Sequence, residues 1–181
     1  MASNQRDNLV WMDMEMTGLD PKTCVVLEIA TLVTDKDLNL LAEGPVLVVH
    51  QPQAILDAMD DWNKEHHGKS GLIEQVKNSK ITLAQAEQST LDFVAQHCAP
   101  KTSPLCGNTI YQDRRFLLEY MPRLEDFFHY RLIDVSTIKE LVKRWYGSES
   151  QAPSKKQTHK ALDDIRETIE ELKFYREKVF R

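Results

Sequence analysis

The chain has 181 residues, of which 41% are hydrophobic and 28% charged, which suffices for one folded domain and is unlike a disordered chain. Its 23 basic and 28 acidic residues leave a net charge of −5, and its basic residues form no run beyond pairs such as Arg114-Arg115. Tight binding to long nucleic acid is therefore disfavoured, because neutralising many phosphates supplies most of that affinity, and only a local basic pocket is compatible with this charge.

The first part of the chain predicts an antiparallel meander. Residues 9–16 alternate with period two, as a strand does. The further strands expected are residues 25–33 and, after a polar hairpin connection at 34–39, residues 46–50. Three successive strands joined by short links pair most simply as antiparallel neighbours.

The rest of the chain predicts helices that alternate with strands. Thr82 and Gln85 form a capping box that opens a helix with apolar residues at helical spacing as far as Cys98. The other elements expected are, in chain order, a helix at about 55–67, a strand at 104–107, a helix at 113–121 stopped by Pro122, a strand at 132–135, a helix opened by Thr137-x-x-Glu140 and ending at Trp145, a loop at 147–157, and an amphipathic C-terminal helix.

This order of elements predicts a single α/β domain over residues 1–181. Its mixed central sheet would combine the antiparallel three-strand meander with parallel strands, and helices would flank it.

The cysteines and the apolar segments indicate a cellular compartment. Cys24, Cys98 and Cys106 are odd in number and lack CxxC spacing, which predicts neither a disulfide framework nor a zinc site. No apolar run approaches the ~18 residues of a membrane span. The polar residues 1–8 lack the apolar centre of a signal peptide. We therefore expect a cytoplasmic protein that does not bind the membrane.

Asp13 and Glu15 stand two positions apart at the end of the first predicted strand, so both carboxylates leave one face where α/β sheets place ligands. Carboxylates this close repel each other unless a cation lies between them, and hard oxygen ligands suit Mg²⁺ or Mn²⁺. The pair is also common enough to be two solvent-facing residues of an edge strand. The apolar neighbours Trp11 and Met16 favour the metal, because charges that end a buried strand need compensation.

Two more carboxylates and a histidine follow on predicted helices. Asp113 comes after the buried strand that ends in Gly107-Asn108, at a helix start where an ordinary N-terminal carboxylate is equally well placed. On the C-terminal helix, Asp164 falls at the border of the apolar stripe and can face the protein, whereas Asp163 falls on the solvated face. His159 lies near the start of that helix, where a lone histidine is more often a cap or a surface residue than a base.

Taken in order, the segments DxExTG, NxxxxD and HxAxxD resemble the three exonuclease motifs of the DEDD superfamily, in its histidine (DEDDh) branch. The resemblance covers nearly the whole chain and includes segments around Trp62 and Tyr130-Arg131 that many DEDDh exonucleases lack, so the chain resembles the oligoribonuclease family. This implies a ribonuclease H-like fold and a 3′-to-5′ exoribonuclease that degrades short oligoribonucleotides, dinucleotides in particular, to nucleoside 5′-monophosphates.

The resemblance also implies a two-metal mechanism. The carboxylates of Asp13, Glu15, Asp113 and Asp164 would hold two Mg²⁺ or Mn²⁺ ions about 4 Å apart. His159 would act as the general base on the attacking water, because a neutral imidazole with a pKa of about 6.5 suits that task near neutral pH.

The binding of short RNA is implied in the same way. The residues concerned are Leu19 and Trp62, which stack on bases, His67 near the 3′ end, Thr109, Tyr130, Arg131 and Ser136 around the 5′ phosphate, and Asn108 as a further substrate-binding residue. The sequence does not separate His67 from the adjacent His66. The family forms homodimers in which the Tyr130 position reaches the partner's active site.

Several alternatives stay open on the sequence alone. Trp62 is equally well explained as a core anchor of the helix at 55–67, and Tyr130 and Arg131 as strand-edge residues or dimer contacts. A general DEDDh exonuclease for longer RNA or DNA ends would need a basic channel, which the charge disfavours. A non-catalytic RNA-binding module of the same fold predicts the loss of a ligand, whereas all four carboxylates and His159 are present.

Overall fold

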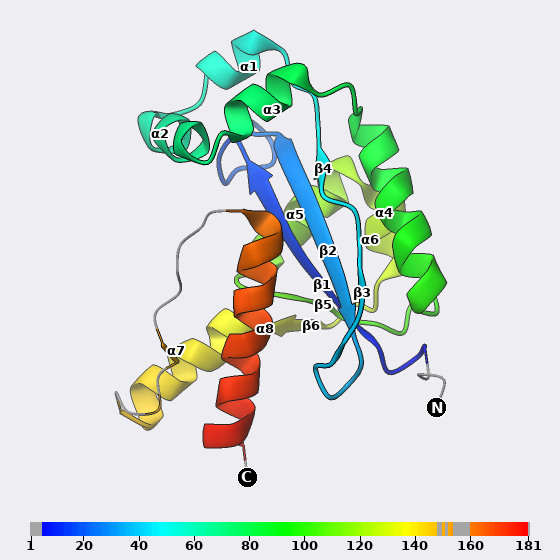
Figure 1. Ribbon diagram of the computed structural model, residues 1–181, viewed down its shortest axis with the longest axis vertical. Helices are drawn as coiled ribbons and strands as arrows, with labels where there is room; N and C mark the ends of the chain where they lie inside the picture. Colours follow the sequence, from blue (N-terminus) through cyan, green and yellow to red (C-terminus); the bar gives the residue numbers. More distant parts are fainter. Residues whose placement is uncertain (1–4, 148–149, 151, 154–159, 181) are drawn as a thin grey trace.

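The structure is a computed structural model that describes residues 5–147, 150, 152–153 and 160–180. In these residues a six-stranded mixed sheet has the order β3-β2-β1-β5-β6, with β4 also paired to β2 (Figure 1). The strands are β1 (Leu9–Met16), β2 (Val26–Thr34), β3 (Leu40–Glu43), β4 (Leu47–Val48), β5 (Leu105–Gly107) and β6 (Leu132–Asp134). The pairs that β2 forms with β1, β3 and β4 are antiparallel, and those of β5 with β1 and β6 are parallel, which confirms the predicted mixed sheet.

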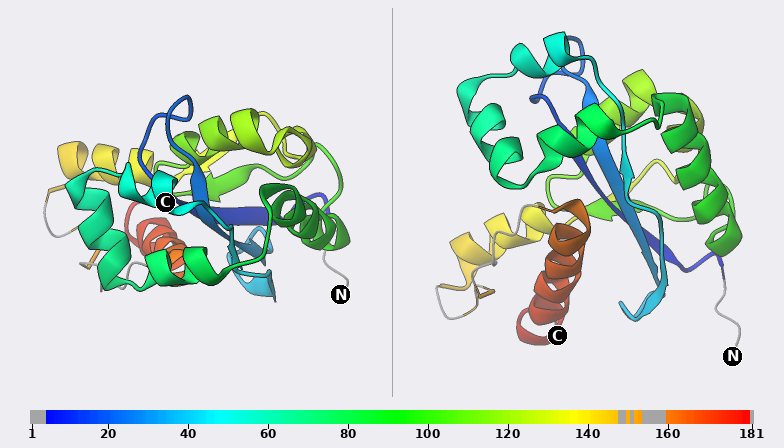
Figure 2. Two further views of the ribbon diagram at one scale, coloured as in Figure 1. Left: turned by 90° about the horizontal axis from the view of Figure 1, so that it is seen from above. Right: turned by 45° about the horizontal axis from the view of Figure 1, so that its top comes forward.

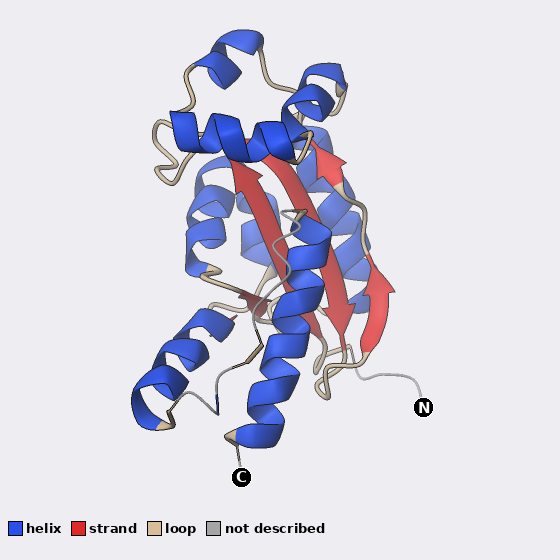
Figure 3. Ribbon diagram, turned by 60° about the vertical axis from the view of Figure 1, so that its left-hand side comes forward, coloured by secondary structure: helices blue, strands red, loops and turns tan. Residues whose placement is uncertain are grey.

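Helices cover both faces of the sheet (Figures 2 and 3). The helices on one face are α4 (Leu83–His97), α5 (Tyr111–Tyr120) and α6 (Pro122–Phe127), and those on the other are α7 (Val135–Trp145) and α8 (Ala161–Lys178). The short helices α1 (Gln53–Asp57), α2 (Asp61–Lys69) and α3 (Leu72–Asn78) lie beyond the C-terminal end of β1 (Figure 1). Of the helices in the described ranges, none has both the length and the apolarity to cross a bilayer.

The alternation in β1 separates two apolar cores, because this strand lies in the middle of the sheet. Met12 and Met14 pack in the core that contains α4, α5 and α6, whereas Trp11 packs against α7 and α8. Asp13 and Glu15 follow Trp11 with period two and therefore point to the α8 side. The interpretation of this pair as part of a solvent-facing edge strand is wrong, since β1 has a neighbour on each side.

The third strand of the meander is divided in two. One strand was expected at residues 46–50, but β3 and β4 both pair with β2, at 40–43 and 47–48. Residues 44–46 separate them, and among these Pro45 has no N–H with which to continue a ladder. The Gly44 N–H still donates to the Thr31 carbonyl, so the chain stays along β2 while the regular pairing is interrupted.

The predicted helix at 55–67 is also two helices. Asp60 has extended backbone angles, and its carboxylate accepts a hydrogen bond from the N–H of Asn63 at 2.7 Å, which makes it the N-cap of α2. Trp62 therefore lies in the first turn of a new helix, with 66% of its surface exposed, and its interpretation as a core anchor is wrong. Helix α3 was not predicted; it begins after Gly71, whose φ of 78° is a left-handed value that glycine adopts at no steric cost.

Two further helix boundaries differ from those expected. Pro122 was expected only to end α5, but it is also the first residue of α6. The N–H of a first helical residue has no partner within the helix, so proline, which lacks it, fits there. Helix α7 begins at Val135 and not at the Thr137-x-x-Glu140 pattern, because the Asp134 side chain accepts from the Ser136 N–H and caps the helix three residues earlier.

A buried hydrogen bond between the two longest strands should be measurable in the stability of the fold. The Trp11 indole N–H donates to Thr34 Oγ1 at 2.9 Å, and neither side chain is exposed. Thr34→Val keeps the shape but leaves the indole N–H without an acceptor, so we expect a loss of about 1–3 kcal/mol in the free energy of unfolding, measured in urea. Thr23→Val, at an exposed turn, is the control and should change it by less than about 0.5 kcal/mol. Equal unfolding midpoints for the two variants would contradict this assignment.

Candidate active site

Three elements bring four carboxylates together at the C-terminal end of β1. Asp13 and Glu15 come from β1 and Asp164 from the first turn of α8, and one oxygen of each lies within 4.8 Å of the others. Asp113 comes from the first turn of α5 and is only 5% exposed. The helical pattern that separated Asp164 from Asp163 is confirmed, because Asp163 pairs at the surface with Arg166.

The shortness of β5 explains how Asp113 reaches this end of β1. Strand β5 pairs with β1 only at Val10 and Trp11, so the N–H of Met14 lies beyond it. That N–H donates to Asp113 Oδ1 at 3.0 Å. Because β5 is short and α5 starts soon after it, the Asp113 carboxylate takes the place beside β1 where backbone pairing with β5 would otherwise continue.

Burial and crowding hold protons on two of these carboxylates, Glu15 and Asp113, in the absence of a cation. Burial, followed by the charges of Asp13, Glu28 and Asp164, raises the pKa of Glu15 to about 8. Burial, and then the charge of Asp13, raises the pKa of Asp113 well above its usual range. The four groups therefore cannot all ionise near neutral pH without a compensating positive charge, and a divalent cation provides it.

A fifth carboxylate, Glu28, supports the site and was not anticipated. It is the one charged residue of β2, stands directly opposite Glu15 in the strand register and is buried. Its carboxylate accepts a hydrogen bond from the N–H of Ala161, the first residue of α8, while burial raises its pKa. Glu28 thus fixes the helix start that carries Asp164. A lone charge in the run VLEIATLVT was the sequence signal for it.

A cavity of ≈ 490 Å³ opens beside Glu15 and includes three of the predicted RNA-binding residues. Leu19, 71% exposed, and Trp62 line it together with His67. The neighbouring His66 stacks on Trp62, with ring centroids 4.6 Å apart. The two histidines thus differ, because His67 lines the cavity whereas His66 is not among its lining residues and stacks on Trp62.

The loop that carries Leu19 is fixed to α5 through main-chain carbonyls. Gln112 Nε2 and Arg115 Nη1 both donate to the Leu19 carbonyl, and Arg115 Nη1 also donates to Gln112 Oε1 at 2.8 Å. The hydroxyl of Tyr120 contacts the carbonyls of Pro21 and Cys24 in the same loop. An exposed leucine is thereby held in place, which is a role for Gln112 and Arg115 that the sequence did not reveal.

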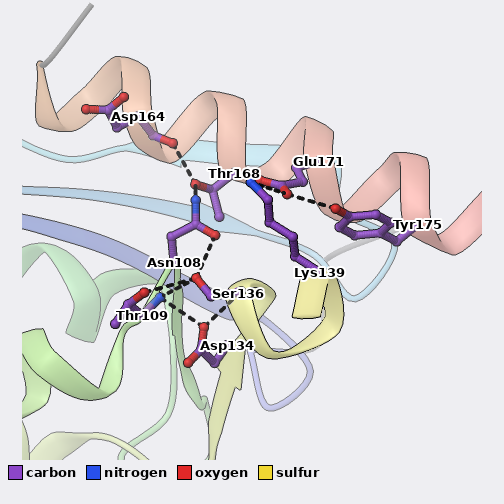
Figure 4. A network of polar contacts seen from close by, with 9 residues as sticks. All are labelled: Asn108, Thr109, Asp134, Ser136, Lys139, Asp164, Thr168, Glu171 and Tyr175. Carbon is purple, nitrogen blue, oxygen red and sulfur yellow. Dashed lines mark hydrogen bonds and ion pairs between the residues drawn. The ribbon is translucent and has the colours of Figure 1, made fainter. Parts of the chain in front are cut away.

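Asn108, Thr109 and Ser136 belong to a hydrogen-bonded network that extends to α8 (Figure 4). The Thr109 N–H donates to Ser136 Oγ at 2.9 Å, and Ser136 Oγ donates to Asn108 Oδ1 at 3.3 Å. Asn108 Nδ2 donates to Thr168 Oγ1 at 2.9 Å, and that hydroxyl donates to the Asp164 carbonyl at 2.8 Å. The side chain of Asn108 therefore joins α8 to the start of α7.

Tyr130 and Arg131 are not among the residues that line the cavity beside Glu15. Tyr130 is 69% exposed, its ring lies 5.3 Å below the guanidinium carbon of Arg131, and it lines a separate cavity of ≈ 200 Å³. Arg114, which donates to the Tyr130 carbonyl at 2.6 Å, pairs with Glu125 and fixes this segment. The structure does not bring Tyr130 into the cavity beside Glu15, and the remaining predicted residue, His159, lies outside the described residues.

Residues 10–172 match a protein family described as Exonuclease. The chain is 60% identical to the oligoribonuclease of Shewanella amazonensis over 181 residues, which cover 100% of this chain and 99% of that protein. It is 59% identical to the oligoribonuclease of Bordetella pertussis with the same coverage, and 58% identical to that of Chromobacterium violaceum over 94% of each chain.

Similar solved structures are exonucleases with low sequence identity. Exonuclease I from Methylocaldum szegediense has a TM-score of 0.70 at 18% identity, over 95% of this chain and 41% of that chain. The zinc-bound complex of E. coli exonuclease I with single-stranded DNA has a TM-score of 0.71 at 14% identity, over 98% of this chain and 42% of that chain. The chain thus spans about two fifths of those proteins, and the likeness confirms the predicted ribonuclease H-like fold.

The raised pKa of Glu15 predicts how pH affects the metal-free protein. Since this pKa rises from 4.5 to about 8 on folding, the folded chain binds the proton more tightly than the unfolded chain between these values. In chelator, Glu15 should therefore lower the free energy of unfolding by about 1–4 kcal/mol as pH rises from 4.5 to 8.

Urea unfolding across this pH range tests the assignment with two variants. Glu15→Gln should remove this part of the decline, whereas Glu170→Gln, at an exposed position of α8, should follow the wild-type profile. If Glu15→Gln declines in parallel with wild type, the proton is not held by Glu15.

Proposed function

The chain belongs to the oligoribonuclease family of exonucleases, and from this we propose that it is a 3′-to-5′ exoribonuclease that degrades short oligoribonucleotides, dinucleotides in particular, to nucleoside 5′-monophosphates. The observation that carries the proposal is the convergence of Asp13, Glu15, Asp113 and Asp164 from β1, α5 and α8. We further propose that residues 1–181 form one exonuclease domain that acts in the cytoplasm, in keeping with its three free cysteines.

The carboxylate cluster fits a pair of hard divalent cations, Mg²⁺ or Mn²⁺. Its donors are oxygens alone, and the protons that burial retains on Glu15 and Asp113 mark an uncompensated negative site. When bound, such ions supply an activated water and stabilise the charge on the attacking and leaving oxygens of a phosphodiester. The protein fixes the positions of the carboxylates. The Met14 N–H donates to Asp113, and the Glu28 carboxylate accepts from the Ala161 N–H at the start of α8.

We place the general base at His159. It precedes Asp164 by five residues and Ala161, the residue held by Glu28, by two. An imidazole there would take the proton of the attacking water near neutral pH, where its unperturbed pKa of about 6.5 leaves it largely neutral.

The cavity beside Glu15 suits the 3′-terminal nucleotide. Leu19 and Trp62 present exposed apolar surfaces on which a base of any identity can stack, at about 1–3 kcal/mol per base. His67 lies in the same wall, within reach of the terminal ribose. A contact of this kind, together with a net charge of −5, favours a small substrate over a long one.

The 5′ phosphate would be held by Thr109, Ser136 and Arg131, with Tyr130 supplied by the second subunit of a homodimer. Thr109 and Ser136 offer hydroxyls that are within 3.1 Å of each other, and Arg131 supplies a forked cation. Tyr130 is exposed and is absent from the cavity of its own chain, which is why we assign it to the partner's site. Asn108 supports Ser136 from behind, since its amide already bonds Ser136 and Thr168.

Hydrolysis of 5′-labelled RNA of two, three, five and seven nucleotides tests the function. With Mg²⁺, the dinucleotide should be cut at least about tenfold faster than the heptamer, and chelator should abolish cutting. Equal rates at all lengths would instead identify a general exonuclease, and no cutting with metal present would favour an RNA-binding module.

The matched pair Asp164→Asn and Asp163→Asn tests the carboxylate assignment in the same assay. Asp164→Asn removes a proposed metal ligand and should lower kcat by about a hundredfold or more. Asp163→Asn loses only a surface contact with Arg166 and should stay within about twofold of wild type. Similar losses in both variants would mean that Asp164 acts through helix stability.

Mixing two inactive variants tests whether Tyr130 acts across a dimer. Tyr130→Ala keeps its carboxylates and Asp164→Asn keeps its tyrosine, so a mixed dimer contains one complete site. An equal mixture should recover up to about a quarter of wild-type sites if subunits exchange at random. A mixture of Asp13→Asn and Asp164→Asn is the control and should recover none. If both mixtures stay inactive after verified exchange, Tyr130 does not act in the partner's site.

A further inference from the structure

A second group of metal-ligating side chains lies next to the four carboxylates. One donor atom each of Glu15, His66 and His67 lies within 4.8 Å of the other two. Both histidines come from α2, whereas Asp13 and Asp164, the other partners of Glu15, come from β1 and α8. Glu15 therefore stands between an all-oxygen cluster on one side and a pair of imidazoles on the other.

The hydrogen bonding of His67 leaves a lone pair directed into this group. Its Nε2 lies 2.9 Å from the carbonyl oxygen of Met16, which can only accept, so Nε2 carries the proton. Its Nδ1 is then an acceptor, is buried in a residue only 2% exposed, and has no hydrogen-bond partner. Glu15 Oε2 lies 3.8 Å from it, too far for a hydrogen bond, and is also an acceptor once this carboxyl has ionised. Two acceptors that face each other across this distance require a cation or a donor between them.

The spacing fits a small ion with short bonds. A tetrahedral Zn²⁺ holds nitrogen and oxygen ligands at about 2.0–2.1 Å, which puts two ligand atoms about 3.4 Å apart. His67 Nδ1 and Glu15 Oε2 need to approach by only a few tenths of an ångström from their 3.8 Å separation. The ring of His66 is already restrained by stacking on Trp62. In this position one nitrogen of His66 lies within 4.8 Å of a donor atom of Glu15 and of His67.

The donor set also selects the metal. Two imidazoles and one carboxylate favour Zn²⁺ over Mg²⁺, because Mg²⁺ prefers oxygen ligands and Zn²⁺ binds nitrogen strongly. The Met16 carbonyl behind His67 is the usual outer partner of a ligating histidine, since it fixes the tautomer and the ring orientation.

We propose that Glu15, His66 and His67 form a zinc site distinct from the pair of magnesium or manganese ions, and that zinc bound there inhibits the enzyme. Zinc would draw Glu15 away from Asp13 and Asp164 and would occupy the wall of the cavity lined by Trp62. Binding of zinc follows from the donor geometry alone, whereas inhibition rests on the proposed exonuclease function.

Zinc titration monitored by the side-chain ¹⁵N resonances of histidine tests the binding directly. The wild-type protein is first saturated with Mg²⁺ and then titrated with Zn²⁺ alone. We expect the Nδ1 signal of His67 and one nitrogen signal of His66 to shift toward metal-bound positions at about one equivalent of Zn²⁺, and the signal of His50 to stay in place. Zinc binding that leaves both His66 and His67 unchanged overturns the proposal.

The variant His66→Gln, compared with His50→Gln at an exposed site, tests the same proposal by affinity and by inhibition. In saturating Mg²⁺, His66→Gln should weaken zinc binding at least tenfold and raise the zinc concentration for half inhibition by the same factor, with its activity in Mg²⁺ alone unchanged. Unaltered zinc inhibition in this variant would show that zinc acts at the cluster of four carboxylates, and would overturn the proposal. An inactive wild type with intact zinc binding to His66 and His67 would refute the exonuclease function and leave the site standing.

Discussion

The carboxylates at the end of β1 repel one another, and the strands and helices around them must hold them together. The fold brings together four carboxylates and partly removes them from water: Asp13, Glu15, Asp113 and Asp164. Without a bound cation, some of these carboxyl groups must keep their protons. Such an arrangement destabilises the fold unless packing elsewhere holds it. Binding of divalent ions at such a site is favourable because their charge removes the repulsion among the carboxylates that the fold has brought together.

The scaffold counters this repulsion from two directions. Strand β1 is buried on both faces, which fixes the two carboxylates that it carries. Helix α8 is held at its start by Glu28 and about two turns later through Thr168, which bonds both Asn108 and the Asp164 carbonyl. The ligand from α8 is thus located by side chains from β2 and from the loop after β5. The same loop leads to the hydroxyls proposed for the 5′ phosphate, so recognition and chemistry share one rigid frame.

The sequence indicated which carboxylates come together but not the contacts that hold them in place. Helical periodicity was enough to separate Asp164 from Asp163, because an amphipathic helix has one buried stripe. Trp62 was ambiguous because the Asp60 cap that divides the helix is a single short-range bond within a helical pattern. Glu28 was missed because its importance comes from a strand pairing and a helix start 133 residues later, which no local pattern encodes.

We propose that these four carboxylates together hold a pair of divalent cations. Anomalous diffraction from crystals soaked in Mn²⁺ tests it without reference to any substrate. We expect two peaks about 4 Å apart, with Asp13, Glu15, Asp113 and Asp164 each within bonding distance of at least one of them. No peak at the end of β1, or a single ion that leaves Asp113 or Asp164 without contact, would contradict it.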